Sequence, residues 1–117
     1  LETIPNVHLI GPQGYLDIVK LQENARLALT DSAGIAEETT ALQVPCLTLR
    51  ENTERPVTIE HGSNQLVGCQ PQRVIEAARA ALADQRTAYS VPPGWDGRSA
   101  ERLVNVLRKG IERRLRY

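Results

Sequence analysis

The stretch from Leu29 to Glu38 contains the residues best suited to chemistry in this chain. An apolar strand is expected to end before Asp31, and the small residues Ser32-Ala33-Gly34 lead directly into a helix. The unpaired amides of a first helical turn and the positive end of the helix dipole favour an anion, and Ser32 adds a hydroxyl group. A diphosphate fits such a site. The alternative is that Ser32 serves only as the N-cap of the helix.

A carboxylate stands one helical turn beyond the small residues. Glu38 lies four positions after Gly34, on the same face of the predicted helix. Its two oxygens can accept hydrogen bonds from two adjacent hydroxyl groups, which is how acidic side chains recognise ribose in nucleotide-binding folds. Spacing alone does not separate Glu37 from Glu38, and an ordinary solvated helix position is the alternative for either residue.

A charged loop, Arg50 to Pro56, follows the next predicted strand. In parallel sheets, ligands bind at the carboxyl ends of the strands, so this loop is expected beside the helix start at Ser32. The guanidinium of Arg55 can pair bidentately with a phosphate, while Glu54 can hold that arginine or contact a sugar hydroxyl. A charged surface loop without a ligand is the alternative.

Short apolar runs alternate with helical patterns along the chain, and this alternation must position the polar residues. It predicts an α/β fold, a Rossmann-like parallel sheet flanked by helices. Buried strands are predicted at Val7 to Ile10, Leu27 to Thr30, Val44 to Leu49 and Gln65 to Gly68. Helices are predicted at Tyr15 to Asn24, at Gly34 to Leu42, from Pro71 to about Leu82, and at Ser99 to Leu115.

The last predicted helix carries an apolar stripe that has no obvious place in a small sheet domain. Its members are spaced four residues apart: Leu103, Leu107, Ile111 and Leu115. Such a stripe is suited to packing on another surface. We therefore expect the chain to associate, with a homodimer as the simplest product.

Composition narrows the class of protein. The chain has 117 residues, enough for one domain, and its 14 basic residues balance 14 acidic ones. The balance disfavours nucleic acid and anionic membranes as partners, and without a long apolar run or a signal peptide a soluble, cytoplasmic protein is expected. Cys46 and Cys69 match no disulfide or zinc pattern and are expected in the core. The chain opens with Leu1 and has no methionine, which indicates a piece of a longer protein.

Several motifs together resemble the UDP-N-acetylglucosamine 2-epimerase family, in order and in spacing, over nearly the whole chain. They are Gly14-Tyr15-Leu16-Asp17, Leu29 to Glu38, Val44-Pro45, Leu49-Arg50, Asn52 to Pro56, Gly62 to Gly68 and Trp95-Asp96-Gly97. The resemblance implies that residues 1–117 form a single, partial UDP-binding domain. This would be part of the C-terminal domain of a two-domain, glycosyltransferase-B-like epimerase, with the N-terminal domain absent.

The resemblance also implies an activity. Family members interconvert UDP-N-acetylglucosamine and UDP-N-acetylmannosamine by eliminating UDP to give a 2-acetamidoglucal and adding it back. Most proton-transfer groups lie outside the part represented here, so no catalytic residue is expected in this chain, which alone would be inactive. The expected ligand is UDP, or UDP-N-acetylglucosamine.

Site residues follow from the same motifs. Ser32 and the amides of Ala33 and Gly34 would bind the diphosphate, although Ala33 stands where the family usually has glycine, which requires that it keep a negative φ. Glu38 would bind the ribose hydroxyls, and Arg55 with Glu54 would lie on the phosphate side. The segment containing Tyr15 and Ile18 would border the uracil.

Two alternatives from other classes remain open at this point. One is a non-catalytic α/β module that binds a nucleotide or a partner chain, and the other is the donor-binding half of a glycosyltransferase. A partner-binding module would not need Glu38 and Glu54-Arg55 together around a small-residue turn, and a glycosyltransferase would not need the Asn52 to Pro56 motif. Whether the parent epimerises or hydrolyses its substrate also stays open. No motif requires a metal, and no Gly-x-Gly-x-x-Gly fingerprint is present, so no cofactor is expected.

Overall fold

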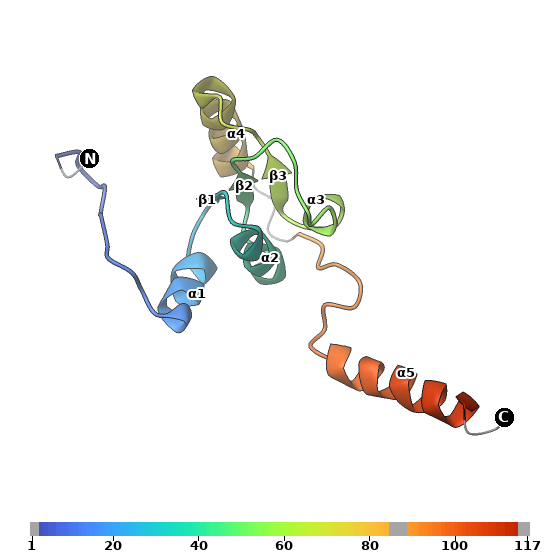
Figure 1. Cartoon of the computed structure of the whole chain (residues 1–117). Coiled ribbons are helices and arrows are strands. Elements are labelled where there is room, and N and C mark those ends of the chain that lie inside the picture. The colour runs from blue at the N-terminus through green and yellow to red at the C-terminus, as the bar shows by residue number, and fades with distance from the viewer. Residues whose placement is uncertain (1–2, 85–88, 115–117) are drawn as a thin grey trace.

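Three short parallel strands form the centre of the chain (Figure 1). The computed structural model describes residues 3–84 and 89–114. The strands are β1 (Ala28–Thr30), β2 (Cys46–Thr48) and β3 (Asn64–Leu66), in that spatial order. Because all three run in the same direction, their carboxyl ends lie at one edge of the sheet.

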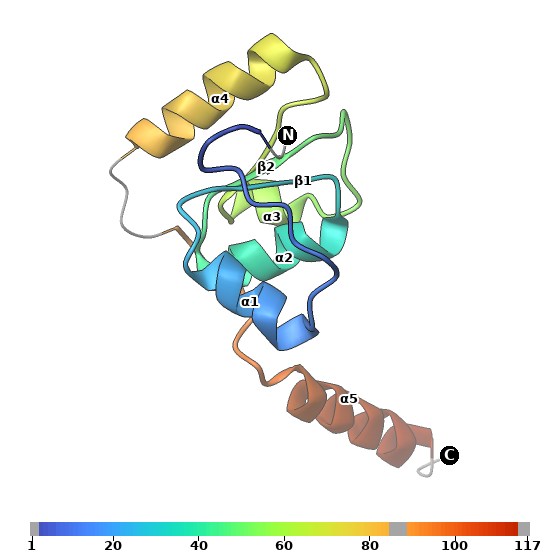
Figure 2. The same cartoon turned by 90° about the vertical axis from the view of Figure 1, so that its left-hand side faces the viewer.

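Helices cover both faces of the sheet. On one face lie α2 (Ala33–Leu42) and the short α3 (Val57–Glu60), while α4 (Pro71–Ala83) lies across the other (Figure 1). The first helix, α1 (Tyr15–Glu23), packs against α2, and α5 (Ser99–Arg114) extends away from the body (Figure 2). The predicted α/β, Rossmann-like arrangement is confirmed.

The predicted strand at Val7 to Ile10 is wrong. This segment has no regular structure, and its side chains Val7, Leu9 and Ile10 are 39%, 59% and 61% exposed. Its amide at Val7 bonds to the Ile4 carbonyl (3.2 Å), as in a turn. Strand backbone needs a neighbouring ladder, and among the described residues this segment is paired with none of the three strands, not even with β1 at the edge of the sheet. The segment is apolar, as a buried strand would be, but its side chains are exposed.

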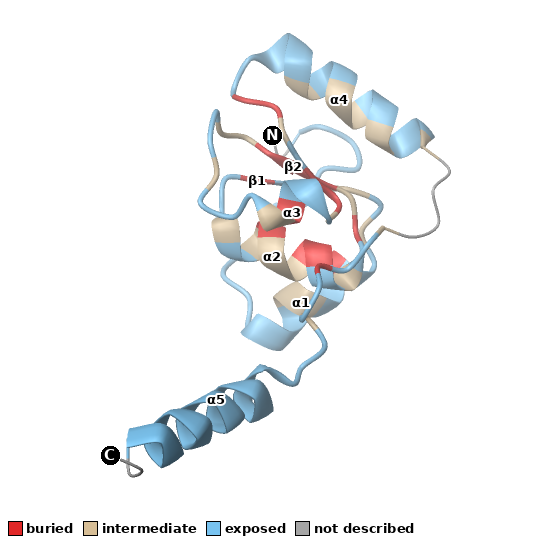
Figure 3. Cartoon of the chain, turned by 90° about the vertical axis from the view of Figure 1, so that its right-hand side faces the viewer, coloured by how far each residue is buried: buried red, intermediate tan, exposed pale blue. Residues whose placement is uncertain are grey.

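The core is small, and its buried residues lie mainly on the sheet and α2 (Figure 3). Many of its side chains are polar. The apolar members include Ala36, Val44, Cys46, Leu47 and Val67. Two threonines of α2 are also completely buried. The Thr39 hydroxyl donates to the Ile35 carbonyl and the Thr40 hydroxyl to the Ala36 carbonyl, both at 2.8 Å. Such internal bonds satisfy buried hydroxyl groups, so threonine is tolerated where an aliphatic residue is more usual.

The two cysteines have different environments. Cys46 is buried in β2, as expected, and burial raises the pKa of its thiol. Cys69 is exposed just after β3, where its thiol donates to the Leu49 carbonyl at 3.2 Å. The expectation of a core position is therefore wrong for Cys69.

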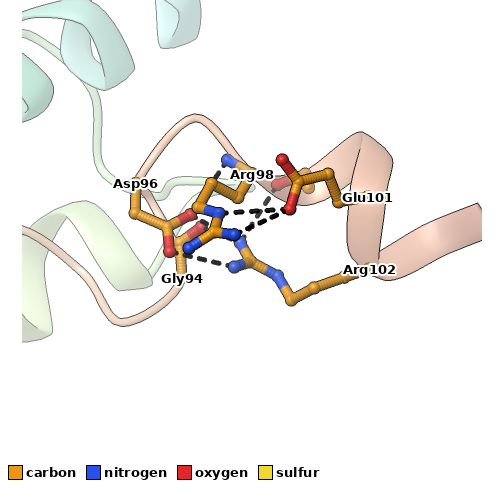
Figure 4. A network of polar contacts seen from close by, with 6 residues as sticks. Gly94, Asp96, Arg98, Glu101 and Arg102 are labelled. Carbon is orange, nitrogen blue, oxygen red and sulfur yellow. Dashed lines mark hydrogen bonds and ion pairs between the residues drawn. The ribbon is translucent and has the colours of Figure 1, made fainter. Parts of the chain in front are cut away.

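A polar network organises the start of α5 (Figure 4). The guanidinium of Arg102 donates two hydrogen bonds to the Asp96 carboxylate, at 2.8 and 3.0 Å, and one to the Gly94 carbonyl at 2.5 Å. The Arg98 amide donates to the same carboxylate at 3.0 Å, and the Arg98 side chain pairs with Glu101 at 2.9 Å. This network joins the loop to the first turn of α5.

The Arg102 guanidinium lowers the pKa of Asp96 to about 2, mainly through its hydrogen bonds. Since the folded pKa lies below the unfolded one, the interaction is fully present above about pH 4 and is lost as the pH falls through about 2. We predict that Arg102→Ala returns the Asp96 pKa toward its ordinary value of 3.8, as measured by NMR titration of the carboxyl carbon. Arg98→Ala, which keeps the backbone amide, is the matched control. An unchanged pKa in Arg102→Ala would contradict the assignment.

The apolar stripe of α5 is uncovered. Leu103, Leu107 and Ile111 are each more than half exposed, while Leu115 lies outside the described residues. No other segment in the described part of the chain covers this stripe. None of the helices described has the length and hydropathy needed to cross a membrane.

Candidate functional site

The segments predicted to form a site meet at the carboxyl edge of the sheet. Backbone hydrogen bonds continue past the strands: the Leu49 amide donates to the Thr30 carbonyl (2.8 Å), and the Val67 amide donates to the Thr48 carbonyl (3.1 Å). These bonds join the residues that follow β2 and β3 to the ends of β1 and β2. The edge is thus a connected surface from which α2 starts.

The N-terminus of α2 is arranged around Ser32. Its hydroxyl accepts from the Ile35 amide at 3.4 Å, so the capping role is present. The Ser32 amide itself donates to the Thr30 hydroxyl at 3.0 Å. Within the described part of the chain, the next two amides, those of Ala33 and Gly34, have no hydrogen-bond partner. Two free donors at the positive end of a ten-residue helix form a suitable contact for an anion.

The backbone at these two residues is unstrained. Outside glycine, the described residues have a positive φ only at Asn6 and Gln43, so Ala33 keeps the negative φ that its position requires. Gly34 is not in the left-handed region either, and a Cβ there would meet only the Ser32 hydroxyl, at an ordinary 3.7 Å. The fold itself therefore has no need of glycine at position 34.

The structure separates the two carboxylates that sequence spacing could not. Glu38 is half-buried and faces α1, where the Gln22 amide donates to its Oε2 at 2.7 Å. Glu37 faces the charged loop and accepts from Arg55 Nε at 2.7 Å. Adjacent acids on one helix thus connect α2 to two different segments.

Arg55 lies beside α2, but Glu54 does not hold it as expected. Arg55 Nη1 donates a long hydrogen bond to the main-chain carbonyl of Glu54 (3.3 Å), and the side chain of Glu54 is not its ionic partner. That partner is the Glu37 carboxylate. Both side chains of this pair are more than one-third exposed, so the pair adds little stability. Its main effect is to fix the direction of the guanidinium.

A relay of hydrogen bonds connects β2 and β3 to the Arg55 loop. Thr48 in β2 donates to the Asn64 side-chain oxygen (2.7 Å), the Asn64 amide donates to the Thr58 hydroxyl (3.0 Å), and Thr58 donates to the Arg55 carbonyl (2.8 Å). Each of the three donors in this relay has an acceptor, which favours a single arrangement of the side chains and the loop that it joins. The relay was not predicted, because it joins four segments whose proximity depends on the strand register.

The expected uracil border lies at the start of α1. Tyr15 is 68% exposed and Ile18 is half-buried. Because α1 packs against α2, and both helices begin on the same side of the molecule (Figure 2), this segment faces the same region as Ser32. Within the described residues, no hydrogen bond joins Tyr15 to the start of α2.

A separate pocket of about 310 Å³ lies at the opposite, amino edge of the sheet. Its lining includes Pro45 and Ser63, which precede β2 and β3, together with Ala80 and Ala81 of α4. Because this pocket is at the other end of the strands, it is not part of the candidate site.

Comparison with known proteins places these features in a family. The model of the UDP-N-acetylglucosamine 2-epimerase family matches residues 1–108. A UDP-N-acetylglucosamine 2-epimerase of Methanocaldococcus jannaschii is 44% identical over 110 residues, and that of Escherichia coli K12 is 38% identical over 109. The matches cover 94% and 90% of this chain but 30% and 29% of those relatives, so the chain spans about a third of their length.

Solved structures agree with the sequence comparisons. A crystal structure of the M. jannaschii enzyme in complex with UDP-GlcNAc and UDP superposes with a TM-score of 0.80 at 43% identity, covering 93% of this chain and 30% of that one. The Neisseria meningitidis enzyme bound to UDP-GlcNAc superposes with a TM-score of 0.73 at 35% identity, with the same coverage. On this evidence the chain belongs to the UDP-N-acetylglucosamine 2-epimerase family.

Proposed function

We propose that this chain is the UDP-binding portion of an enzyme that interconverts UDP-N-acetylglucosamine and UDP-N-acetylmannosamine. On this proposal, residues 1–117 are part of the C-terminal domain of a two-domain epimerase. The observation that carries it is the pair of unpartnered amides at Ala33 and Gly34, at the start of the helix that also carries Glu38 and that the Arg55 loop contacts. The similar structure of the M. jannaschii enzyme, which contains UDP-GlcNAc and UDP, supports the proposal.

Each part of the nucleotide has a matching group. The diphosphate takes the two amides and the Ser32 hydroxyl, with Arg55 as the nearby cation. The ribose hydroxyls donate to Glu38, whose Oε1 has no partner within the described residues. The uracil lies beside Tyr15 and Ile18, and Glu54 accepts a hydrogen bond from a sugar hydroxyl group.

This arrangement suits the departure and return of UDP. When the bond between sugar and diphosphate breaks, negative charge develops on the leaving phosphate oxygen. Donors fixed at that position, the α2 amides and the Arg55 guanidinium, stabilise this charge more than that of the intact substrate. The chain therefore holds the leaving group, and we assign no proton transfer to any of its residues.

Calorimetric titration of this chain with UDP tests the proposal, with Glu38→Ala and Arg55→Ala alongside. We expect weak binding to the original chain and about ten- to a hundredfold loss in each variant, because each removes a charge-assisted hydrogen bond to the ligand. Lys20→Ala, which removes an exposed surface charge paired with Glu23, is the matched control and should bind as the original does. Equal binding by all four chains, or no heat from a folded sample, would refute the proposed site.

We also propose that the chain self-associates through α5. The uncovered residues Leu103, Leu107 and Ile111 form the apolar face of this helix, and contiguous apolar surface of this kind favours association. Sedimentation should give a mass of about twice 12.9 kDa, and Leu107→Glu should return the chain to a monomer. A monomer at every concentration for the original chain would contradict the proposal. We further propose that the protein is cytoplasmic. Its balanced charge supports the proposal that it binds neither nucleic acid nor anionic membranes.

A further inference from the structure

The contact between α1 and α2 contains a buried glutamine whose position needs an explanation. Gln22 is only 7% exposed, although it lies on a helix whose other residues are mostly exposed. Its Nε2 donates to Glu38 Oε2 at 2.7 Å. Its Oε1 is fully buried and has no hydrogen-bond partner in the described part of the chain.

This arrangement is unfavourable for the folded chain taken alone. A buried carbonyl oxygen without a donor destabilises the fold, and an apolar side chain of the same shape avoids that loss. Reversing the amide does not help, since it places Gln22 Oε1 against a carboxylate oxygen, and both atoms are acceptors. Gln22 therefore has one satisfied group, and that group is directed at Glu38.

We infer that Gln22 is a positioning residue, which holds the Glu38 carboxylate in the orientation that accepts the ribose hydroxyls of a bound uridine nucleotide. The inference rests on the proposed function and adds to it a residue that does not touch the nucleotide. By occupying Oε2 from the side of α1, Gln22 fixes the carboxylate plane and leaves Glu38 Oε1 for the diol. A fixed acceptor loses less conformational freedom when the ligand binds, so the bond to ribose is stronger.

The ribose diol provides a specific test. Calorimetry compares UDP with 2′,3′-dideoxyuridine 5′-diphosphate, which has the same base and diphosphate but no hydroxyl groups for Glu38. The variants are Gln22→Met, which matches the glutamine in shape and lacks the donor, and Glu38→Gln. A general packing role for Gln22 affects both ligands equally, whereas a role exercised through Glu38 affects only UDP.

We expect the original chain to prefer UDP by about ten- to a hundredfold, the range for a hydrogen bond to a charged group. Gln22→Met should weaken UDP binding about three- to tenfold and leave dideoxy-UDP binding unchanged, and it should add little further loss to Glu38→Gln. Its thermal stability should equal or exceed that of the original chain, because the unsatisfied carbonyl oxygen is gone.

Three outcomes overturn the inference. If Glu38→Gln loses the preference for UDP and Gln22→Met keeps it, Gln22 does not position Glu38, and the proposed function stands. If the original chain binds both nucleotides equally or binds neither, the proposed ribose contact fails and the role of Gln22 fails with it. If Gln22→Met and the second variant Gln22→Leu both fail to fold while Glu38→Gln folds, Gln22 is a structural residue.

Discussion

Replacing Gly62 with alanine is expected to destabilise the folded chain by about 1–3 kcal/mol, the usual cost of overpacking a core. A Cβ at this position would overlap the main-chain carbonyl oxygen of Thr58 and lie 2.6 Å from the Thr40 side-chain methyl. Both threonines are completely buried, and the overlapped carbonyl belongs to backbone, so the neighbours cannot move aside cheaply. The contact of α2 with α3 must therefore open.

The same substitution should also reach the candidate site. Thr58 is the last donor of the relay that ends on the Arg55 carbonyl, so its displacement moves the Arg55 loop. Urea unfolding followed by circular dichroism measures the loss of stability. Gly110→Ala is the matched control, because its Cβ meets nothing within 4 Å in the exposed helix α5, and it should stabilise that helix by up to ~1 kcal/mol. Equal unfolding midpoints for Gly62→Ala and the original chain would show that the predicted overlap is absent.

Replacing Gly34 with alanine is expected to have the opposite profile, with unchanged stability and at least a tenfold loss of UDP affinity. The fold accepts a methyl group here, since the Cβ would lie an ordinary 3.7 Å from the Ser32 hydroxyl and the backbone is not left-handed. The ligand is the group that needs the space, because a diphosphate bound by the Ala33 and Gly34 amides must approach the main chain closely. A tenfold loss corresponds to about 1.4 kcal/mol, within the worth of one charge-assisted hydrogen bond.

Gly11→Ala provides the comparison for that measurement. Gly11 also has open space at its Cβ position, but it lies in the irregular segment before α1. It should change neither stability nor UDP binding. If Gly34→Ala binds UDP as well as Gly11→Ala does, the diphosphate does not lie on the first turn of α2.

Local features of this fold could be predicted from the sequence, and features that depend on neighbours could not. The helix at Tyr15–Glu23 and the strand at Ala28–Thr30 lie within the predicted segments Tyr15 to Asn24 and Leu27 to Thr30, because the spacing of apolar residues distinguishes a helix from a strand. The run Val7 to Ile10 has the same apolar pattern as a strand, yet no partner strand adjoins it among the described residues. Cys69 likewise follows a buried strand but points outward.

The same distinction between local features and features that depend on neighbouring segments holds for the candidate site. Ser32, Ala33 and Gly34 are contiguous, so a strand that turns into a helix was enough to bring their donors together. The pairs Gln22–Glu38 and Arg55–Glu37 join residues 16 and 18 positions apart, and only helix packing decides which carboxylate meets which partner. One signal for Gln22 was available, since it follows Ile18 by four positions on the half-buried face of α1.

The most direct test of the proposed UDP site is to follow the backbone amide signals of this chain by NMR while UDP is added. If the diphosphate binds at the start of α2, the largest saturable shifts will occur at Ala33 and Gly34, with a smaller change at the Gln22 side-chain amide. Shifts confined to Ser63 and Ala81 would place the nucleotide in the pocket at the amino edge instead. That result, or a spectrum that UDP leaves unchanged, would contradict the assignment of this chain as a UDP-binding half-site.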